Sequence, residues 1–164
     1  MPCPCGNYLD PTKSCTCSSY VVQRYWSKLS GPLLDRIDLQ IEVPRIKREE
    51  LTGLPNGETS AEIKQRIKLA REIQRLRFQG TEVFCNARMS SRQLKENSRL
   101  SVEAEGFLKS AILHLHLSAR GYDRILKIAR TIADLAGQTM IEANHIAEAV
   151  QYRSLERQPS VGSG

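Results

Sequence analysis

The sequence predicts a mainly α-helical protein, and three observations support this fold class. From residue 59 to about residue 155, apolar residues recur at helical spacing between Ser, Thr and Gly residues that favour helix ends. Aromatic residues make up only 5% of the chain, which suits helix packing by Leu, Ile and Ala. Strand-like alternation is confined to residues 39–43. No apolar run approaches the ~20 residues that a membrane helix requires, so no membrane association is expected.

The N-terminal third differs from the rest of the chain in its predicted secondary structure. Residues 18–36 have the pattern of one helix, and residues 39–43 that of one short strand. The backbone donors and acceptors of a single strand need partners, so its sheet is expected to lie in another segment or another polypeptide. Residues 52–58 contain two Gly, one Pro and one Asn, which indicates a linker after residue 51.

After the linker, helix signals follow one another to residue 157. Thr59 and Glu62 form a capping box for a helix that extends to about Phe78. Further helices are expected from Ser90 or Ser91, from about Ser101, from Ser118 to Gly137, and over roughly 142–155. Residues 59–157 are therefore predicted to form a helical bundle, and the polar residues 158–164 a disordered tail.

Four of the five cysteines lie within the first seventeen residues. Cys3, Cys5, Cys15 and Cys17 form two tight pairs around a turn-rich loop, an arrangement that can place four thiolates around one tetrahedral Zn²⁺. Such a site is structural, because no coordination position remains for water. A disulfide pair or reduced thiols without a role are the alternatives. No apolar stretch follows Met1, which argues against an oxidising compartment.

The formal charge of +6 favours polyanionic partners without identifying one. Basic residues are concentrated in the helix after the linker, where Lys64, Lys68, Arg71 and Arg75 are candidate DNA contacts. The alternative is a solvated helix face, since no aromatic residues are interleaved for base stacking. The chain contains no Gly-rich phosphate loop, acidic metal-binding strand end or nucleophile–base pair, so no complete catalytic site is expected.

Three runs of sequence together carry a family resemblance: PCPCG at 2–6, SGPLLDRIDL at 30–39 and LSARGYDRILKIARTIADLAG at 117–137. They resemble, in the same order, the C-terminal part of the ComM/YifB-type, magnesium-chelatase-like AAA+ ATPases of bacteria. The resemblance implies that residues 1–51 are the end of an AAA+ core with its cysteine loop, and that 59–157 are the helical lid. It also implies a nucleotide-binding core upstream, with Met1 standing where the family has its sensor-1 Asn.

The resemblance also implies roles for three arginines. Arg36 occupies the place of an arginine finger, which reaches the γ-phosphate bound by a neighbouring subunit in trans. The alternative is an ion pair with Asp35 or Asp38. Arg120 occupies the place of the sensor-2 residue, which binds nucleotide in its own subunit, and Arg124 could assist it. The alternative for both is a solvated helix face.

The function implied by this resemblance is that of a hexameric, cytoplasmic AAA+ ATPase acting on DNA in branch migration or a helicase-like step of natural transformation and recombination. ATP and Mg²⁺ are then expected only in the full-length protein, which supplies the N-terminal core and the neighbouring subunits, and the present chain alone is expected to be inactive. Two alternatives remain: a stand-alone zinc-containing nucleic-acid-binding adaptor, and a magnesium-chelatase-like subunit.

Overall fold

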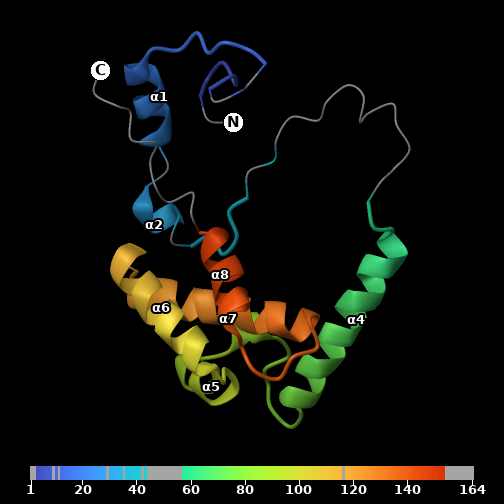
Figure 1. Cartoon of the computed structure of the whole chain (residues 1–164). Coiled ribbons are helices and arrows are strands. Elements are labelled where there is room, and N and C mark those ends of the chain that lie inside the picture. Colours follow the sequence, from blue (N-terminus) through green and yellow to red (C-terminus); the bar gives the residue numbers. More distant parts are fainter. Residues whose placement is uncertain are drawn as a thin grey trace. The chain divides into compact units, whose positions relative to one another are not determined.

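The computed structural model describes residues 3–8, 10, 12–28, 30–34, 36–41, 43, 57–115 and 117–153. These residues fall into two compact units, divided between Gln40 and Ile41, and each unit is considered by itself. The described part of the chain is mostly helical and contains no strand, only an isolated bridge between Leu100 and Ile141 (Figure 1). The predicted mainly α-helical class is thus confirmed.

In the N-terminal unit, the prediction of a single helix over 18–36 is wrong. Helix α1 covers Ser19–Trp26, and a separate turn of helix, α2, covers Gly31–Leu34. The side chain of Ser18 caps α1, with its Oγ accepting a hydrogen bond from the N–H of Val21 (3.4 Å). The break has a local cause: Pro32 lacks an N–H and its ring would clash with the carbonyl four residues earlier in a continuous helix.

The strand expected at residues 39–43 is not formed at 39–41 or 43, the positions that the structure describes there. Leu39, Ile41 and Val43 are exposed, with 54%, 64% and 77% of their surface accessible. An extended segment becomes a strand only when a neighbour supplies hydrogen bonds. None of the described segments pairs with these residues, and where their partner strands would lie stays a prediction.

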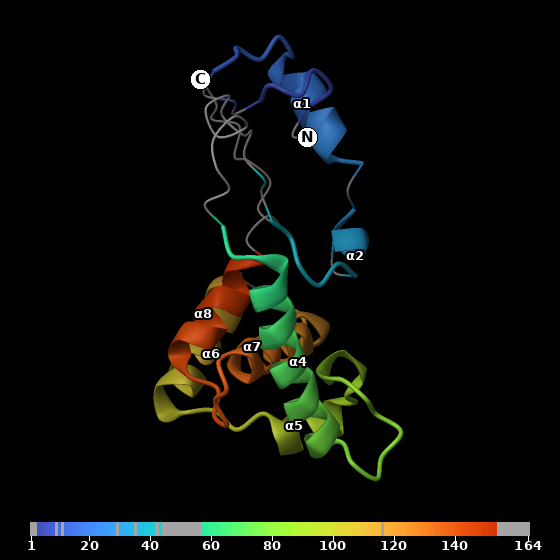
Figure 2. The ribbon, with the colours of Figure 1, turned by 90° about the vertical axis from the view of Figure 1, so that its right-hand side faces the viewer.

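The C-terminal unit is a helical bundle built around one long helix. Helix α7 (Ala119–Leu135) contacts α8 (Ala143–Gln151), α4 (Ser60–Arg77), α5 (Ser91–Asn97) and the short 3₁₀ turn η1 (Asn86–Arg88). Helix α6 (Val102–Leu115) packs on α8 (Figures 1 and 2). Helix α7 is thus the element on which α4, α5, α8 and η1 all pack.

The ends of these helices follow the signals in the sequence. Thr59 Oγ1 accepts from the N–H of Glu62 (3.3 Å) and Glu62 Oε2 accepts from the N–H of Thr59 (2.8 Å), which confirms the capping box. Ser118 Oγ accepts from the N–H of Gly121 (3.1 Å) and starts α7. Gly137, with φ of +69°, follows its end. Helix α8 ends at Gln151, earlier than the expected 155, and the expected tail lies outside the described residues.

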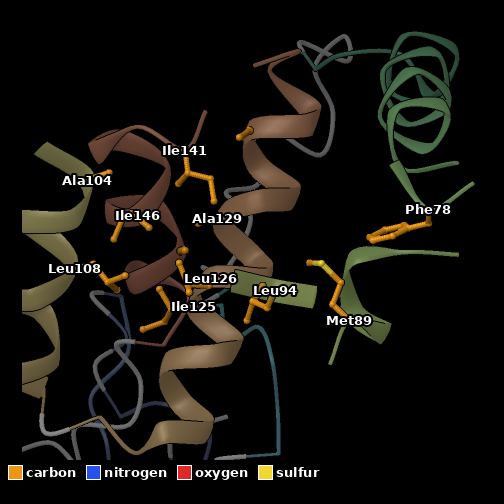
Figure 3. Close-up of a cluster of buried hydrophobic side chains, with 12 residues drawn as sticks. Phe78, Met89, Leu94, Ala104, Leu108, Ile125, Leu126, Ala129, Ile141 and Ile146 are labelled. Carbon is orange, nitrogen blue, oxygen red and sulfur yellow. The ribbon is translucent and has the colours of Figure 1, made fainter. Parts of the chain in front are cut away.

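The core of the bundle lies between α7, α8, α6 and α5 (Figure 3). Leu94, Ile125 and Ile146 have no accessible surface. Helix α4 is buried only in its C-terminal half, at Ala70 and Gln74, and Phe78, which directly follows it, belongs to the core; the N-terminal half is exposed along its length. The bundle is therefore tightly packed around α7 and only partly covered by α4.

Candidate functional site

The four N-terminal cysteines come together in a single cluster. Cys3 Sγ lies 3.3 Å from Cys5 Sγ and 3.7 Å from Cys15 Sγ, and Cys5 Sγ lies 3.5 Å from Cys15 Sγ. All four sulfurs, including that of Cys17, lie within 4.8 Å of one another. A tetrahedron with Zn–S bonds of about 2.3 Å has edges of about 3.8 Å. The separations are thus near those of a tetrathiolate site, and all four thiols are free rather than joined as disulfides.

The loop holds this cluster through backbone turns. The N–H of Gly6 donates to the carbonyl of Cys3 (3.0 Å), and Gly6 has φ of +79°, a conformation that suits glycine. The N–H of Tyr8 donates to Cys3 Sγ (3.3 Å), and such a bond orients the sulfur. Further along the loop, the side chain of Asp10 accepts from the N–H of Thr12 (2.8 Å). Short-range turns therefore bring the two cysteine pairs together.

The ionisation of these thiols is strongly interdependent. Backbone N–H groups of Asn7 and Thr16 lower the pKa of Cys5 to about 5. The backbone N–H of Cys17 acts to lower the pKa of Cys15, but loss of solvent and the sulfurs of Cys5 and Cys3 outweigh it and raise the pKa to about 12. Thiolates this close repel one another, and a divalent cation removes that repulsion. Four soft sulfur donors in this arrangement fit Zn²⁺.

Arg36 lies in the turn that follows α2. Its N–H donates to the carbonyl of Leu33 (3.0 Å), which closes the turn, and the residue is exposed. No ion pair joins its guanidinium to Asp38 or to any other residue that the structure describes, while Asp35 lies outside the described residues. The side chain is therefore available to an external anion.

Arg120 lies in the first turn of α7, two residues after the capping residue Ser118. It is exposed, and its guanidinium has no partner within the described ranges. Arg124 follows one turn later on the same face and is half-buried. The first N–H groups of a helix have no intrahelical acceptor, so a cation at this end adds to an existing preference for anions.

The basic residues of α4 divide into paired and unpaired ones. Arg75 donates to Glu72 (2.6 and 3.0 Å) and is engaged in that ion pair. Lys64, Lys68 and Arg71 are exposed and make no ion pair with any residue that the structure describes. Their i, i+4, i+7 spacing places them on one helix face over roughly 10 Å. Of the four DNA-contact candidates, three thus present unneutralised charge.

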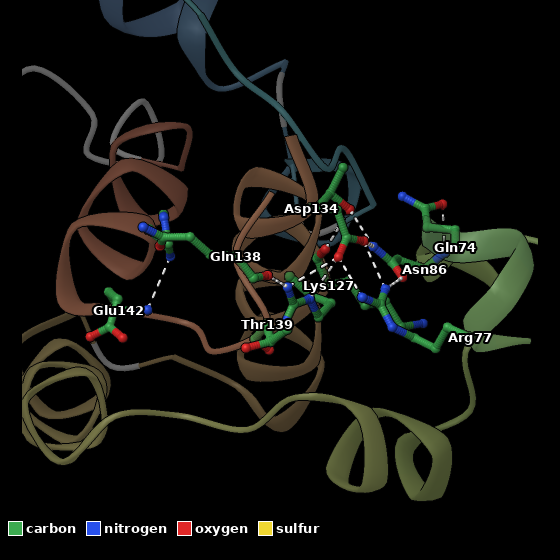
Figure 4. Close-up of polar contacts among 11 residues, drawn as sticks. Gln74, Arg77, Asn86, Lys127, Asp134, Gln138, Thr139 and Glu142 are labelled. Atoms are coloured by element: carbon green, nitrogen blue, oxygen red, sulfur yellow. Dashed lines mark hydrogen bonds and ion pairs between the residues drawn. The ribbon is translucent and has the colours of Figure 1, made fainter. Parts of the chain in front are cut away.

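A buried polar cluster, which the sequence did not suggest, surrounds Asp134 on α7 (Figure 4). Arg77 donates to both of its carboxylate oxygens (2.7 and 2.5 Å), and Asn86 Nδ2 donates to Oδ2 (2.7 Å). Arg130 Nε donates to Oδ1 (3.1 Å), and its terminal nitrogens donate to the carbonyls of Thr139 (2.6 Å) and Gln138 (2.5 Å). The cluster fastens α4, η1 and the loop after α7 to the central helix.

The charges of this cluster do not cancel. Arg77 and Arg130 carry two positive charges against the one negative charge of Asp134. Burial lowers the pKa of Arg130, and the charge of Arg77 lowers it further, against the attraction of Asp134. The Arg130–Asp134 spacing of four was readable as a helical ion pair. Arg77 and Asn86 are 57 and 48 residues from Asp134, and no local pattern connects them.

Comparison with known families identifies the class of protein. Residues 57–153, more than half of the chain, match the family described as magnesium chelatase, subunit ChlI C-terminal. Residues 1–51 match the family described as magnesium chelatase, subunit ChlI. The chain therefore belongs to the magnesium chelatase ChlI C-terminal family.

Individual relatives agree with this assignment. The chain is 41% identical over 157 residues to the competence protein ComM of Haemophilus influenzae, covering 95% of this chain and 30% of that protein. It is 39% identical over 158 residues to the uncharacterised protein YifB of Escherichia coli, with the same coverage of 95% and 30%. The chain thus spans about a third of the length of these relatives. None of the described helices combines the length and apolar character that a membrane crossing requires.

Proposed function

We propose that this chain is the lid and arginine-finger part of a hexameric AAA+ ATPase that acts on DNA. Membership of the magnesium chelatase ChlI family and similarity to a competence protein support this proposal. The observation that carries it is the position of Arg120, which is exposed and unengaged by described residues in the first turn of the central helix. A cation there can bind a phosphate, and α7 can transmit the nucleotide state to every helix that packs on it.

Arg36 supplies the second part of the mechanism. Phosphoryl transfer needs positive charge at the oxygens where negative charge develops, and guanidinium keeps its charge and pairs with two oxygens at once. An exposed arginine in a short turn suits delivery to a neighbouring subunit, because no partner in its own described surroundings has to be released first. In this proposal, ATP and Mg²⁺ bind to the full-length protein, which supplies the residues that hold them.

The cysteine cluster has a structural role in the proposal. Four sulfurs at near-tetrahedral separations fill the coordination sphere of Zn²⁺ and leave no place for a reacting water. The metal would hold the loop that precedes α1, at the start of the segment that carries Arg36. It supplies folding free energy where few side chains are buried.

The decisive experiment uses the full-length protein and mixed hexamers. Arg36→Ala is expected to lower ATP turnover on the order of 10³-fold with little change in nucleotide binding, whereas Arg120→Ala weakens both. Arg24→Ala is the matched control, since Arg24 is an exposed arginine of α1 without a side-chain partner among the described residues. Mixing Arg36→Ala subunits with phosphate-loop-mutant subunits should restore part of the activity, because some sites then combine an intact loop with an intact finger.

Absence of recovery in hexamers shown to be mixed would contradict a role for Arg36 in trans. Magnesium-dependent turnover by the purified 164-residue chain alone would contradict the division of labour between this part and the rest of the protein.

DNA contact through α4 is tested separately. Lys68→Gln should weaken DNA binding by the full-length protein and reduce the slope of log K against log salt by about 0.7–0.9. Lys95→Gln on α5 is the matched control, because Lys95 is also an exposed helical lysine without a partner among the described residues. Equal slopes for the two variants would show that the exposed basic face of α4 does not contact DNA.

A further inference from the structure

A surface depression of about 300 Å³ lies beside the buried Asp134 cluster. It is lined by three arginines, one carboxylate and two neutral polar residues, namely Arg77, Arg99, Arg130, Glu96, Asn97 and Thr139. Two of these arginines belong to the cluster itself (Figure 4). The depression therefore adjoins the cluster, and Arg77, whose side chain is 15% exposed, is the arginine of the cluster that reaches the surface there.

The charges around the depression sum to an excess of positive charge. Arg77 and Arg130 share the one carboxylate of Asp134, so one of their two charges is not neutralised. Arg99 is exposed, and its guanidinium contacts no partner within the described parts of the chain. Glu96, the acidic lining residue, already accepts a hydrogen bond from Arg92 (3.0 Å). Two positive charges among the lining residues thus remain without a carboxylate partner.

Two of the three lining arginines are also held in place, which distinguishes this site from a cluster formed only by exposed side chains. The side chain of Arg130 is 1% exposed, and that of Arg77 is 15% exposed. Both are fixed by several hydrogen bonds to Asp134, Asn86 and the carbonyls of Gln138 and Thr139. Guanidinium groups that are already ordered lose little further conformational entropy when they bind an anion.

We propose that this depression binds a phosphate monoester. Such a group carries close to two negative charges at neutral pH and three acceptor oxygens, which matches the two uncompensated guanidinium charges. A phosphodiester or a carboxylate carries one charge and would leave half of the excess unneutralised. The inference is independent of the proposed ATPase function, because Arg36 and Arg120 do not line the depression.

The test is an NMR titration of the 164-residue chain with methyl phosphate in 150 mM salt. Saturable shifts of the Arg99 and Thr139 amides are expected, with a dissociation constant on the order of 1 mM. Dimethyl phosphate, which has one negative charge, should bind at least tenfold more weakly. Shifts that rise linearly without saturation, or equal affinity for the two esters, would overturn the proposal.

Two pairs of variants distinguish binding at the depression from a general attraction between the basic chain and the phosphate anion. Arg99→Gln should weaken methyl phosphate binding about tenfold, while Arg88→Gln, an equal charge change at an exposed residue outside the depression, leaves it unchanged. Glu96→Gln should tighten binding severalfold, and Glu103→Gln on α6 should not. All four side chains are exposed, so the fold is expected to persist. Equal effects within either pair would contradict a defined site.

Two further ligands test which kind of molecule carries the phosphate monoester that the depression binds. AMP and a 5′-phosphorylated oligonucleotide both present a phosphate monoester, and their 5′-hydroxyl counterparts do not. Tighter binding of AMP assigns the site to nucleotides, and tighter binding of the oligonucleotide assigns it to nucleic-acid ends. Equal binding of the phosphorylated and 5′-hydroxyl forms would refute recognition of the monoester.

Discussion

The cysteine loop and the helical bundle are ordered by different means. In the loop, Cys3 is buried and the other three cysteines are half-buried, so the segment places sulfurs together rather than apolar side chains. In the bundle, Leu94, Ile125 and Ile146 are fully buried in one continuous core. Burial of apolar surface stabilises the bundle without help, whereas close thiols repel one another as they ionise. The bundle is thus ordered by packing, whereas the loop gathers sulfur ligands and, if it binds the proposed zinc, depends on that metal.

The bundle also contains a polar exception to its packing. Asp134 and Arg130 are buried on the face of α7 that meets α4 and η1, where hydrogen bonds replace apolar contact. Like the cysteine cluster, this arrangement brings side chains together whose charges would be costly without their partners. The two clusters differ in what neutralises their charge. The described hydrogen-bond partners of Asp134 are all protein side chains, whereas the proposed partner of the cysteine sulfurs is a metal ion.

The largest effect is expected from removal of the metal. Structural zinc contributes about 10–16 kcal/mol of apparent binding free energy in small metal-dependent folds. Chelation, or Cys15→Ser, should therefore disorder residues 3–17 while the amide shifts of the bundle stay unchanged. Elemental analysis should give about one zinc per chain before chelation.

Cys85→Ser is the matched control for this experiment, because Cys85 is a half-buried thiol outside the cluster. It should leave the zinc content at its original value. Loss of bundle structure on chelation would show that the two regions do not depend on separate sources of stability.

A smaller effect, confined to the bundle, is expected from Asp134→Ala. The substitution leaves Arg77 and Arg130 buried without a carboxylate, a change that typically costs about 3–5 kcal/mol. Urea denaturation followed by the circular dichroism of the helices measures the loss. Glu103→Ala, at an exposed position of α6, should stay within about 0.5 kcal/mol of the parent. Zinc content that falls together with bundle stability would contradict the separation of the two regions.

Loss of one helix cap should have a still smaller effect. Ser118 Oγ accepts the hydrogen bond from the N–H of Gly121 that begins α7. Ser118→Ala should destabilise the bundle by about 1 kcal/mol, whereas Ser118→Asp should retain most of the cap. The same denaturation experiment distinguishes them. Equal stability of both variants would show that packing of α7 alone fixes where it begins.

The smallest effect is a dependence on pH at the exposed start of α4. Hydrogen bonds from the N–H and hydroxyl of Thr59 lower the pKa of Glu62 below its ordinary value of 4.5. A carboxyl whose pKa is lower in the folded state stabilises that state above its ordinary pKa and loses this contribution as pH falls through the lowered value. The Thr59 amide shift should therefore change only below about pH 4.5. Glu62→Gln should remove most of this change, and an undiminished change would assign it to another group.

Much of the local structure of the bundle could be predicted from the sequence. The capping box of Thr59, the caps at Ser90 and Ser118, and the helix end before Gly137 all depend on residues within one turn of each other. The clustering of Cys3, Cys5, Cys15 and Cys17 was likewise expected from spacing, because a short loop limits how far its ends can separate. Whether that cluster holds zinc remains a prediction.

Other features could not be predicted in this way. The helix expected over 18–36 is interrupted before Gly31, where the effect of Pro32 outweighs the apolar pattern. The strand expected over 39–43 is not formed at its described positions, because period-two alternation identifies a face but supplies no partner. A pattern of side chains therefore predicts conformation reliably only where the hydrogen-bond partners are local.

The sequence by itself determined where the capped helices of the bundle begin and the grouping of the cysteines, since each depends on neighbours along the chain. Only the tertiary structure decided that Arg77, Asn86 and Asp134 meet in one buried cluster and that Arg99 shares a surface depression with Arg77. The physical reason is distance along the chain. Hydrogen bonds between residues about fifty positions apart form only after packing on α7 has fixed where α4 and η1 lie.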